Sequence, residues 1–240
     1  MLTSSALFDA LWPLLILLAV PLIFFIMRPR RFYLVRHGET LMNAARVKQG
    51  EDGALSPKGR HQADKVGAYL KNFPIQRIIS STYPRARETT ELINAHLKVP
   101  VIYSSLFVER RNPSEVVGKN RDDADVERIV DQIDLAYHAD DYRYSDEENF
   151  VDLRKRAKKC INLLARQGVR ETCVVTHHVF LKMFIANLLY RHQLHAADFA
   201  KLSFFNMSDN AGITICEFHP WLFWNATRGW EVVSYNEQPE

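Results

Sequence analysis

The chain has 240 residues, of which 47% are hydrophobic, and it carries a formal net charge of +3. This length allows one domain with a small addition. The excess charge sits in Arg28, Arg30 and Arg31, because without these and Asp9 there remain 28 basic and 27 acidic residues. That balance argues against nucleic-acid binding. Three scattered cysteines outside any C-x-x-C pair argue against a disulfide framework or a zinc site, and favour a reducing compartment (Cys160, Cys173, Cys216).

The first predicted element is an apolar segment, residues 10–27, which contains no charged residue. As a helix it would span about 27 Å, close to the thickness of a bilayer core. We interpret it as a transmembrane helix. The arginines at 28–31 then place the C-terminal side in the cytoplasm. We therefore expect a single-pass membrane protein, with an anchor and basic flank at 1–31 and a catalytic domain at 32–240.

Two other interpretations of this segment are weaker. A cleaved signal peptide would have basic residues before the apolar run and small residues after it. A buried soluble helix is the other alternative, but the run is apolar on every face, whereas a helix of a small domain usually keeps one polar face. The segment has no G-x-x-x-G pattern, so it gives no support for helix dimerisation, and the oligomeric state stays open.

Buried strands and amphipathic helices then follow in turn. "FYLV" (residues 32–35) predicts a strand. The next helix has Ser56 as N-cap and Pro57 at its first position. Its apolar residues recur at helical spacing (Ala63, Val66, Leu70). A second strand is expected over Arg77–Ser81, and a second helix from Pro84, with Ala86, Leu92, Ile93 and Leu97 facing inward.

The strand expected over residues 99–103 contains Pro100, which predicts an edge position. Residues 109–148 are polar and predict a long excursion with short helices. A helix is expected from Phe150 to about Arg166, with Leu153, Ala157, Ile161 and Leu164 on one face. Then come a strand over Thr172–Thr176, another helix, and late strands over 212–218 and 230–235. This alternation predicts a three-layer α/β/α sandwich with a mainly parallel central sheet.

The aromatic segment 218–230 leaves three possibilities open: a core-packing turn, a membrane-contacting loop or a partner site.

Polar residues follow the ends of the predicted strands. "LVRHGET" places Arg36 and His37 directly after the first strand. The other strands are followed by further candidates (Arg85 and Arg87, Glu109, His177 and His178). The carboxyl ends of parallel strands meet at one edge of a sheet, so these side chains can converge on one pocket.

This set of residue types suits phosphate chemistry. Two arginines match a phosphate dianion, and the N-terminus of a helix adds backbone donors. One histidine can attack phosphorus and a second can stabilise the transferring oxygens, while a carboxylic acid protonates the departing alkoxide. Gly38 lets the backbone approach the phosphate closely. We therefore expect His37 to be the nucleophile and Arg36 to hold phosphate.

From Phe32 to Tyr235 the sequence resembles the histidine phosphatase superfamily, the phosphoglycerate-mutase-like family. The resemblance rests on several blocks: "RHGETLMNAARVKQG", "LSPKGRHQA", "SSTYPRARETT", "LFVERRNPSEVVG", "EENFVDLRKRA" and "VVTHHVFLK". It implies the catalytic set Arg36, His37, Arg85, Glu109 and His177, with Arg87 outside it. It implies phosphate or substrate binding by Asn43 and Gln49, and no metal or cofactor.

The sequence departs from the family pattern at two places. His178 stands where glycine is usual, next to the catalytic set, and is a further candidate for substrate binding. Asn149 stands where serine is common at a helix entry.

Among members of this family we expect a phosphatase. The segment "RRNPSEVVGKN" differs from the mutases' usual E-R-x-Y-G, and its Arg110, Arg111 and Lys119 either bind an anionic substrate or form a solvated loop. The apolar segment is similar to that of the family's membrane-anchored protein phosphatases. The substrate is a phosphoprotein or a small phosphorylated metabolite. The alternatives are a phosphoglycerate-type phosphomutase and a silent membrane-tethered interaction module, which the intact catalytic set disfavours.

Overall fold

The computed structural model describes residues 17, 19–20, 27–135, 139–204, 208–222 and 228–239. Most of the predicted transmembrane segment, residues 10–27, lies outside these residues. Within them, no helix combines the length and apolar character that crossing a membrane requires.

The core of the fold is a single six-stranded sheet with the order β3-β2-β4-β1-β5-β6. Its strands are β1 (Arg30–Arg36), β2 (Arg77–Ser80), β3 (Val101–Tyr103), β4 (Glu171–Thr176), β5 (Ile213–Phe218) and β6 (Trp230–Glu237). β1 to β4 are parallel to one another, whereas β5 pairs antiparallel with both β1 and β6. The expected mainly parallel sheet is confirmed, and so is the edge position of the strand that follows Pro100.

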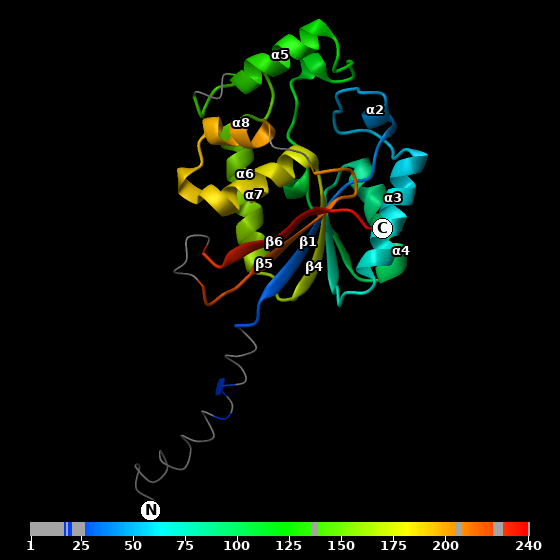
Figure 1. Ribbon diagram of the computed structural model, residues 1–240, viewed down its shortest axis with the longest axis vertical. Coiled ribbons are helices and arrows are strands. Elements are labelled where there is room, and N and C mark those ends of the chain that lie inside the picture. Colours follow the sequence, from blue (N-terminus) through cyan, green and yellow to red (C-terminus); the bar gives the residue numbers. More distant parts are fainter. Residues whose placement is uncertain are drawn as a thin grey trace, which may run out of the picture.

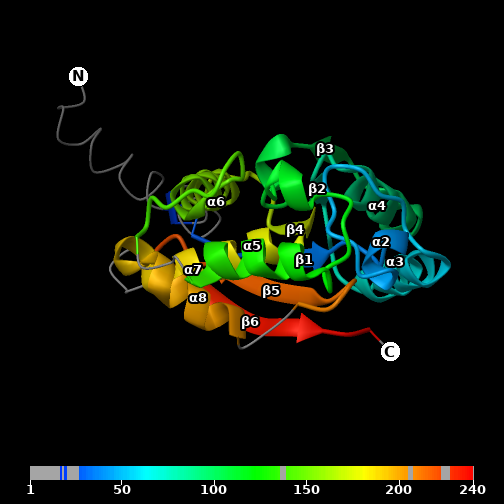
Figure 2. The same ribbon diagram turned by 90° about the horizontal axis from the view of Figure 1, so that it is seen from above.

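Helices cover both faces of this sheet (Figures 1 and 2). α3 (Pro57–Leu70) and α4 (Pro84–Leu97) pack on one face, and α6 (Phe150–Ala165) and α7 (His178–Tyr190) pack on the other. Successive side chains of a strand point to opposite faces. Accordingly Tyr33 and Val35 join the core beneath α3 and α4, while Phe32 and Leu34 join the core beneath α6 and α7. The three-layer sandwich expected from the sequence is present.

Capping residues set where two of these helices begin. The Ser56 hydroxyl accepts a hydrogen bond from the Gly59 amide at 3.0 Å, as its position before Pro57 predicts. Asn149 caps α6 by accepting from the Asp152 amide at 3.1 Å. Asn149 is therefore the N-cap of this helix, at the position where serine is common.

The polar excursion forms a small layer of its own over the carboxyl ends of the parallel strands. It contains the 3-10 turns η1 (Ser105–Phe107) and η2 (Ser114–Val116) and the helix α5 (Ala124–Leu135). Its apolar residues make a separate cluster (Val116, Val126, Ile129, Ile133). Figure 2, which looks down on this end of the sheet, shows α5 crossing above β1 and β4.

Shorter helices complete the described part of the chain: α2 (Leu41–Ala44), η3 (Arg191–Gln193) and α8 (Ala196–Phe204). In the aromatic segment, Trp230 is buried and its ring contacts the rings of Phe32, Phe184 and Phe218. For Trp230 the core-packing interpretation therefore holds.

Two glycines fix the contact between the loop after β1 and the start of α3. A Cβ on Gly38 would lie 2.4 Å from the Gly59 carbonyl oxygen, and a Cβ on Gly59 would lie 2.0 Å from the Glu39 carbonyl oxygen. Both obstacles are backbone atoms, which cannot rotate away. The sequence predicts that Gly38 allows the close approach of a phosphate, whereas its observed close neighbour is Gly59 of α3.

We expect Gly59→Ala to lower the free energy of unfolding by about 1–3 kcal/mol, since the added methyl group forces the loop and the helix apart. Gly168→Ala is the matched control, because nothing lies within 4 Å of its Cβ position and its φ is not positive. Urea unfolding of both variants measures the effect. Equal stability of the two would contradict the packing role of Gly59.

Candidate active site

A cavity of about 300 Å³ lies at the carboxyl ends of the parallel strands. It is lined by Arg36, His37, Asn43, Lys48, Gln49, Arg85, Glu109, Arg110, Asn112, Arg121, His178, Val179, Ser208 and Asp209. His177 lies directly behind His37, with 5.1 Å between the ring centroids. The structure thus brings the five residues of the predicted catalytic set together, although they come from four separate segments of the sequence.

The pairing of β1 with β4 places the two histidines side by side. Arg36 is in register with Thr176, and the His37 amide donates to the Thr176 carbonyl at 3.0 Å. His177 follows Thr176 directly, at the point where α7 begins.

The His37 ring is held by its own loop. Its Nδ1 lies 2.7 Å from the Gly38 carbonyl oxygen. A carbonyl oxygen can only accept, so the bond places the proton of the neutral ring on Nδ1 and leaves the lone pair on Nε2. Burial, with Arg85 and Arg36 close by, keeps the pKa of His37 well below its ordinary value. The ring is therefore neutral at physiological pH, with Nε2 able to attack.

Arg85 is almost completely buried on the first turn of α4. One of its terminal nitrogens, Nη1, donates to the carbonyl oxygens of residues 50, 51 and 52 at 3.0–3.2 Å. Its Nε donates to His177 Nδ1 at 3.3 Å. The His177 ring proton then belongs on Nε2, which donates to the Ser81 hydroxyl at 2.7 Å. Arg87, by contrast, stacks on Tyr103 away from the cavity.

Arg36 reaches across to the chain just before β5. Its Nη1 donates to the Ser208 carbonyl at 2.5 Å, and its buried Nε has no hydrogen-bond partner among the described residues. Leaving a buried donor unpaired is energetically costly unless a ligand accepts its hydrogen bond.

His178 lies close to the same segment. The Ser208 hydroxyl lies 3.0 Å from His178 Nδ1. Burial and the positive charge of Arg36 lower the pKa of His178 to about 3, so this ring is neutral too.

Glu109 sits at the N-terminus of α7. Its Oε1 accepts from the amides of Phe180 and Arg110 at 3.0 and 2.9 Å, and its Oε2 accepts from the Val179 amide at 3.2 Å. Backbone donors at the start of a helix are a favourable environment for a carboxylate. They also fix the direction in which the carboxylate faces the cavity.

Arg156 on α6 supports the segment that carries Glu109. It donates to the carbonyl oxygens of Leu106, Val108 and Glu109 at 2.9, 2.7 and 3.3 Å. The same guanidinium pairs with Glu148, and both side chains are largely buried. The sequence analysis did not single out Arg156, although it lies inside the "EENFVDLRKRA" block.

The predicted substrate-binding residues divide into three groups. Asn43, Gln49, Arg110 and His178 line the cavity. Arg111 lines a second cavity of about 370 Å³ next to it, which shares Gln49, Arg110 and Asn112 with the first. Lys119 is exposed and lines neither cavity. The structure does not test their binding roles, which stay predictions.

Several lining residues were missed by sequence reasoning (Lys48, Asn112, Arg121, Ser208, Asp209). Lys48 is next to Gln49 inside the block "RHGETLMNAARVKQG", and this position could have indicated that it lines the site. Arg121 and Asp209 lie in polar stretches without periodicity, so only the folded loops reveal them.

In the part of the chain that the structure describes, no group of three or more His, Cys, Asp or Glu residues could hold a metal ion.

Comparisons with known proteins agree with this geometry. Residues 32–237 match the family model described as "Histidine phosphatase superfamily (branch 1)". The chain belongs to the histidine phosphatase superfamily.

The broad-specificity phosphatase YOR283W of Saccharomyces cerevisiae is 29% identical over 199 residues, which cover 78% of this chain and 79% of the yeast protein. The probable phosphoglycerate mutase GpmB of Escherichia coli O1:K1 is 32% identical over 160 residues, or 65% of this chain and 74% of GpmB. The fold is similar to that of the mycobacterial glucosyl-3-phosphoglycerate phosphatase Rv2419c, with a TM-score of 0.71, 23% identity, and coverage of 87% of this chain and 99% of that one. The protein is thus an enzyme of the histidine phosphatase type.

The neutral histidines of this histidine phosphatase predict a loss of stability in acid. Below about pH 6.5 the unfolded chain binds protons at His37, His177 and His178, whose folded pKa values are lowered. The free energy of unfolding therefore falls as the pH falls, by about 1 kcal/mol per pH unit for each group. For His178 this continues down to about pH 3.

We expect His178→Gln to weaken this dependence, so that it loses less stability than the wild type between pH 7 and pH 5. Denaturant unfolding at several pH values measures the slopes. His61→Gln, at an exposed site on α3, is the control and should leave the slope unchanged. Parallel slopes in wild type and His178→Gln would contradict the buried neutral state of His178.

The contacts of Arg156 identify it as a positioning residue for Glu109. We expect Arg156→Gln to lower kcat about 10–100-fold with an alkyl phosphate, whose leaving oxygen needs a proton. The loss should be much smaller with p-nitrophenyl phosphate, whose leaving group departs unprotonated. Arg154→Gln, two positions away on the same helix and bonded to other carbonyl groups, is the control. Equal losses on both substrates would show that Arg156 does not act through Glu109.

Proposed function

We propose that this protein hydrolyses phosphomonoesters through a phosphohistidine formed on His37. The observation that supports this most directly is the 2.7 Å contact from His37 Nδ1 to the Gly38 carbonyl, which leaves Nε2 unprotonated in a cavity rich in cations. A histidine presented in this way is a nucleophile suited to an electrophilic phosphorus atom.

In the first step, His37 Nε2 forms a bond to phosphorus while the bond to the leaving oxygen breaks. Glu109, entering the step as a carboxylic acid, gives its proton to that oxygen. Oε2 is the better position for this proton, because it accepts one backbone N–H whereas Oε1 accepts two. The proton on His37 Nδ1 remains on that nitrogen, hydrogen-bonded to the Gly38 carbonyl oxygen, throughout both steps.

In the second step, a water molecule attacks the phosphohistidine and gives its proton to the Glu109 carboxylate. The bond between phosphorus and Nε2 breaks, which returns the electron pair to the ring. Inorganic phosphate leaves, and both side chains have recovered their starting protonation states.

Arg36, Arg85 and His177 hold the phosphoryl oxygens in this proposal. Arg36 offers its unpaired Nε. Arg85 uses Nε and Nη1 for the protein, so Nη2 remains for substrate. A guanidinium already anchored to three backbone carbonyls binds phosphate without losing further side-chain freedom. Once Arg85 Nε turns to the phosphate, His177 would hold a phosphoryl oxygen in its other tautomer, with the ring proton on Nδ1 and Nε2 accepting from the Ser81 hydroxyl.

The substrate we propose is a phosphoprotein or a small phosphorylated metabolite. The second cavity adjoins the first and leaves room for the group that carries the phosphate. Arg110 and Arg111 lie at this second cavity and would favour an acidic partner.

We further propose that residues 10–27 anchor the protein in a membrane as a single transmembrane helix. The basic flank would place the catalytic domain, residues 32–240, on the cytoplasmic side. This rests on the uncharged run of the sequence and on the arginines that follow it.

A phosphoglycerate-type phosphomutase is the second candidate, favoured by the 32% identity to the protein named probable phosphoglycerate mutase GpmB. A mutase uses the same first step but returns the phosphoryl group to substrate instead of water. A catalytically silent interaction module is the third candidate, and it would form no phosphohistidine.

We expect His37→Ala to lower kcat at least about 1,000-fold on whichever phosphomonoester the wild type hydrolyses, since no nucleophile remains. A panel of phosphomonoesters and phosphopeptides without added metal measures this. His61→Ala is the matched control, and circular dichroism checks that both variants are folded.

Each outcome of this experiment selects among the candidates. Full activity of His37→Ala would overturn the phosphohistidine proposal. Labelling of His37 by substrate phosphate with no net release of inorganic phosphate would identify a mutase. A folded wild type that neither turns over substrate nor becomes labelled would identify an interaction module.

A further inference from the structure

The edge of the sheet opposite the catalytic cavity is strongly basic. β1, β2 and β4 begin at this edge, and the helices α3, α4 and α6 end at it. The cations there, which we call the basic edge, are Arg28, Arg30, Arg31, Lys71, Arg77, Lys98, Arg166, Arg170 and Arg228. They come from separate parts of the chain, so only the topology reveals them as one surface.

Hydrogen bonds connect the middle of this surface. Arg30 Nη1 donates to the carbonyl of Ala165 at the end of α6, at 3.0 Å. Arg77 Nη1 donates to Gln167 Oε1 at 2.7 Å. Arg166, between these two acceptors, is exposed. The starts of β1 and β2 and the end of α6 therefore present their cations together.

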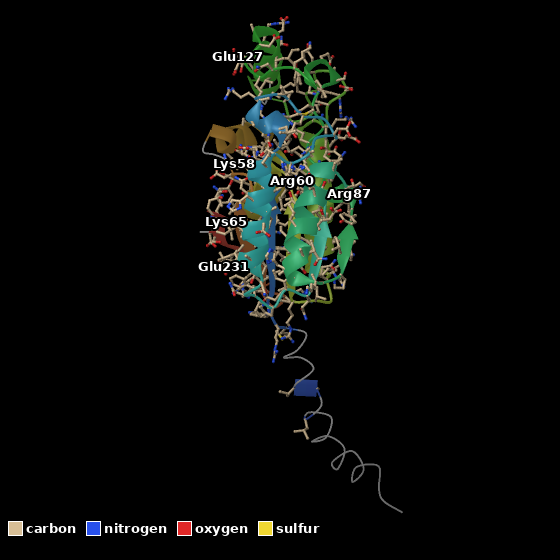
Figure 3. The ribbon with its side chains drawn as sticks, turned by 90° about the vertical axis from the view of Figure 1, so that its right-hand side faces the viewer. Lys58, Arg60, Lys65, Arg87, Glu127 and Glu231 are labelled. Atoms are coloured by element: carbon tan, nitrogen blue, oxygen red, sulfur yellow. The ribbon has the colours of Figure 1, made fainter. Side chains whose placement is uncertain are left out.

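The carboxylates at this edge offset only part of that charge. Glu217 is paired with Arg31. Glu171 is half-buried, and burial raises its pKa. Glu231, labelled in Figure 3, is exposed near the start of β6. Since the chain outside residues 28–31 is almost neutral, the excess of cations here reflects where the fold places them.

The basic edge is also where the apolar segment joins the domain. Met27, its last residue, is followed by the start of β1 at Arg30. Three residues of extended chain reach about 10 Å, which is about one Debye length at physiological ionic strength. If residues 10–27 cross a membrane, as proposed above, the basic edge lies within electrostatic range of its headgroups.

We infer that the basic edge is a lipid-facing surface that binds the headgroups of anionic phospholipids. It would fix the orientation of the domain on the bilayer, in addition to the anchor that tethers it. This inference rests on the proposed anchor for the nearness of the membrane, and on the positions of the described cations for the orientation.

This orientation has a consequence for the substrate. β1 has seven residues and spans about 23 Å, with the basic edge at its start and His37 directly after its end. Figure 1 shows α5 at the end of the domain opposite the start of β1. The catalytic cavity therefore opens to the aqueous phase, and the enzyme acts on soluble phosphomonoesters instead of the phosphates of its own bilayer.

The test uses the full chain in nanodiscs of pure phosphatidylcholine and in nanodiscs that contain phosphatidylserine. We expect backbone amides at residues 71–77 and 166–171 to exchange hydrogen more slowly on the anionic discs. Adding 1 M salt should remove the difference, because screening shortens the range of the attraction. Equal exchange on both discs, in protein shown to be inserted, would overturn the inference.

Matched variants distinguish a specific effect of the basic edge from a general effect of the positive charge of the protein. The triple variant Lys71→Gln, Lys98→Gln, Arg166→Gln should lose the lipid-dependent protection. The control triple variant Lys65→Gln, Lys155→Gln, Lys159→Gln removes the same charge from the exposed flanks of α3 and α6 and should keep it. Both should retain wild-type turnover of a soluble phosphomonoester. Loss of protection in both, or in neither, would overturn the inference.

Failure of the anchor and failure of the basic edge give different results. A protein that alkaline carbonate extracts from membranes has no transmembrane anchor, which would refute that part of the proposed function. Sedimentation with phosphatidylserine vesicles then tests whether the basic edge binds anionic lipid without an anchor. Binding that weakens about fivefold for each removed cation supports it, and absence of binding overturns it.

Discussion

The parallel pairing of β1 with β4 at the centre of the sheet is the constraint on which the site depends. It sets Arg36 opposite Thr176 and brings His37 and His177, 140 positions apart by their numbers, to ring contact. A shift of one residue in this register would turn every side chain of β1 to the other face. Phe32 and Leu34 would then leave the core under α6 and α7, so the hydrophobic cores protect the register that assembles the site.

The second feature that organises the site is the cost of burying charge. Arg36 is half-buried and Arg85 is buried, both close to two histidines, and this arrangement is tolerable because both rings stay neutral. The same condition leaves a lone pair on His37. The features that make the pocket stable and those that make a nucleophile are therefore the same. The Nε of Arg36 is a buried hydrogen-bond donor for which the described residues supply no acceptor.

The two ends of the parallel strands carry different kinds of positive charge. At the carboxyl ends the cations line one cavity. At the starting ends they are spread over an exposed edge, next to the apolar segment. A helix that connects two parallel strands must run back along the sheet, which separates these two surfaces. One side can then be specialised for chemistry and the other for attachment.

By itself the sequence determined most of the architecture and the five central residues. Alternating apolar runs of the correct lengths predict strands and helices, and Ser56 and Pro84 mark helix starts by purely local chemistry. The residues at strand ends follow from the rule that parallel strands share an edge. Sequence reasoning also assigned Arg85 and not Arg87 to the site, through the family resemblance.

Only the tertiary structure decided the rest, because it depends on contacts between distant segments. The clash that requires Gly38 and Gly59, the tautomer of His37, and the support of Glu109 by Arg156 are set by loops that meet in space. Arg121 and Asp209 come from aperiodic stretches, whose path no local pattern predicts. Beyond Arg28, Arg30 and Arg31 the basic edge is likewise not apparent from the sequence, since it forms only when strand starts and helix ends gather at one side of the sheet.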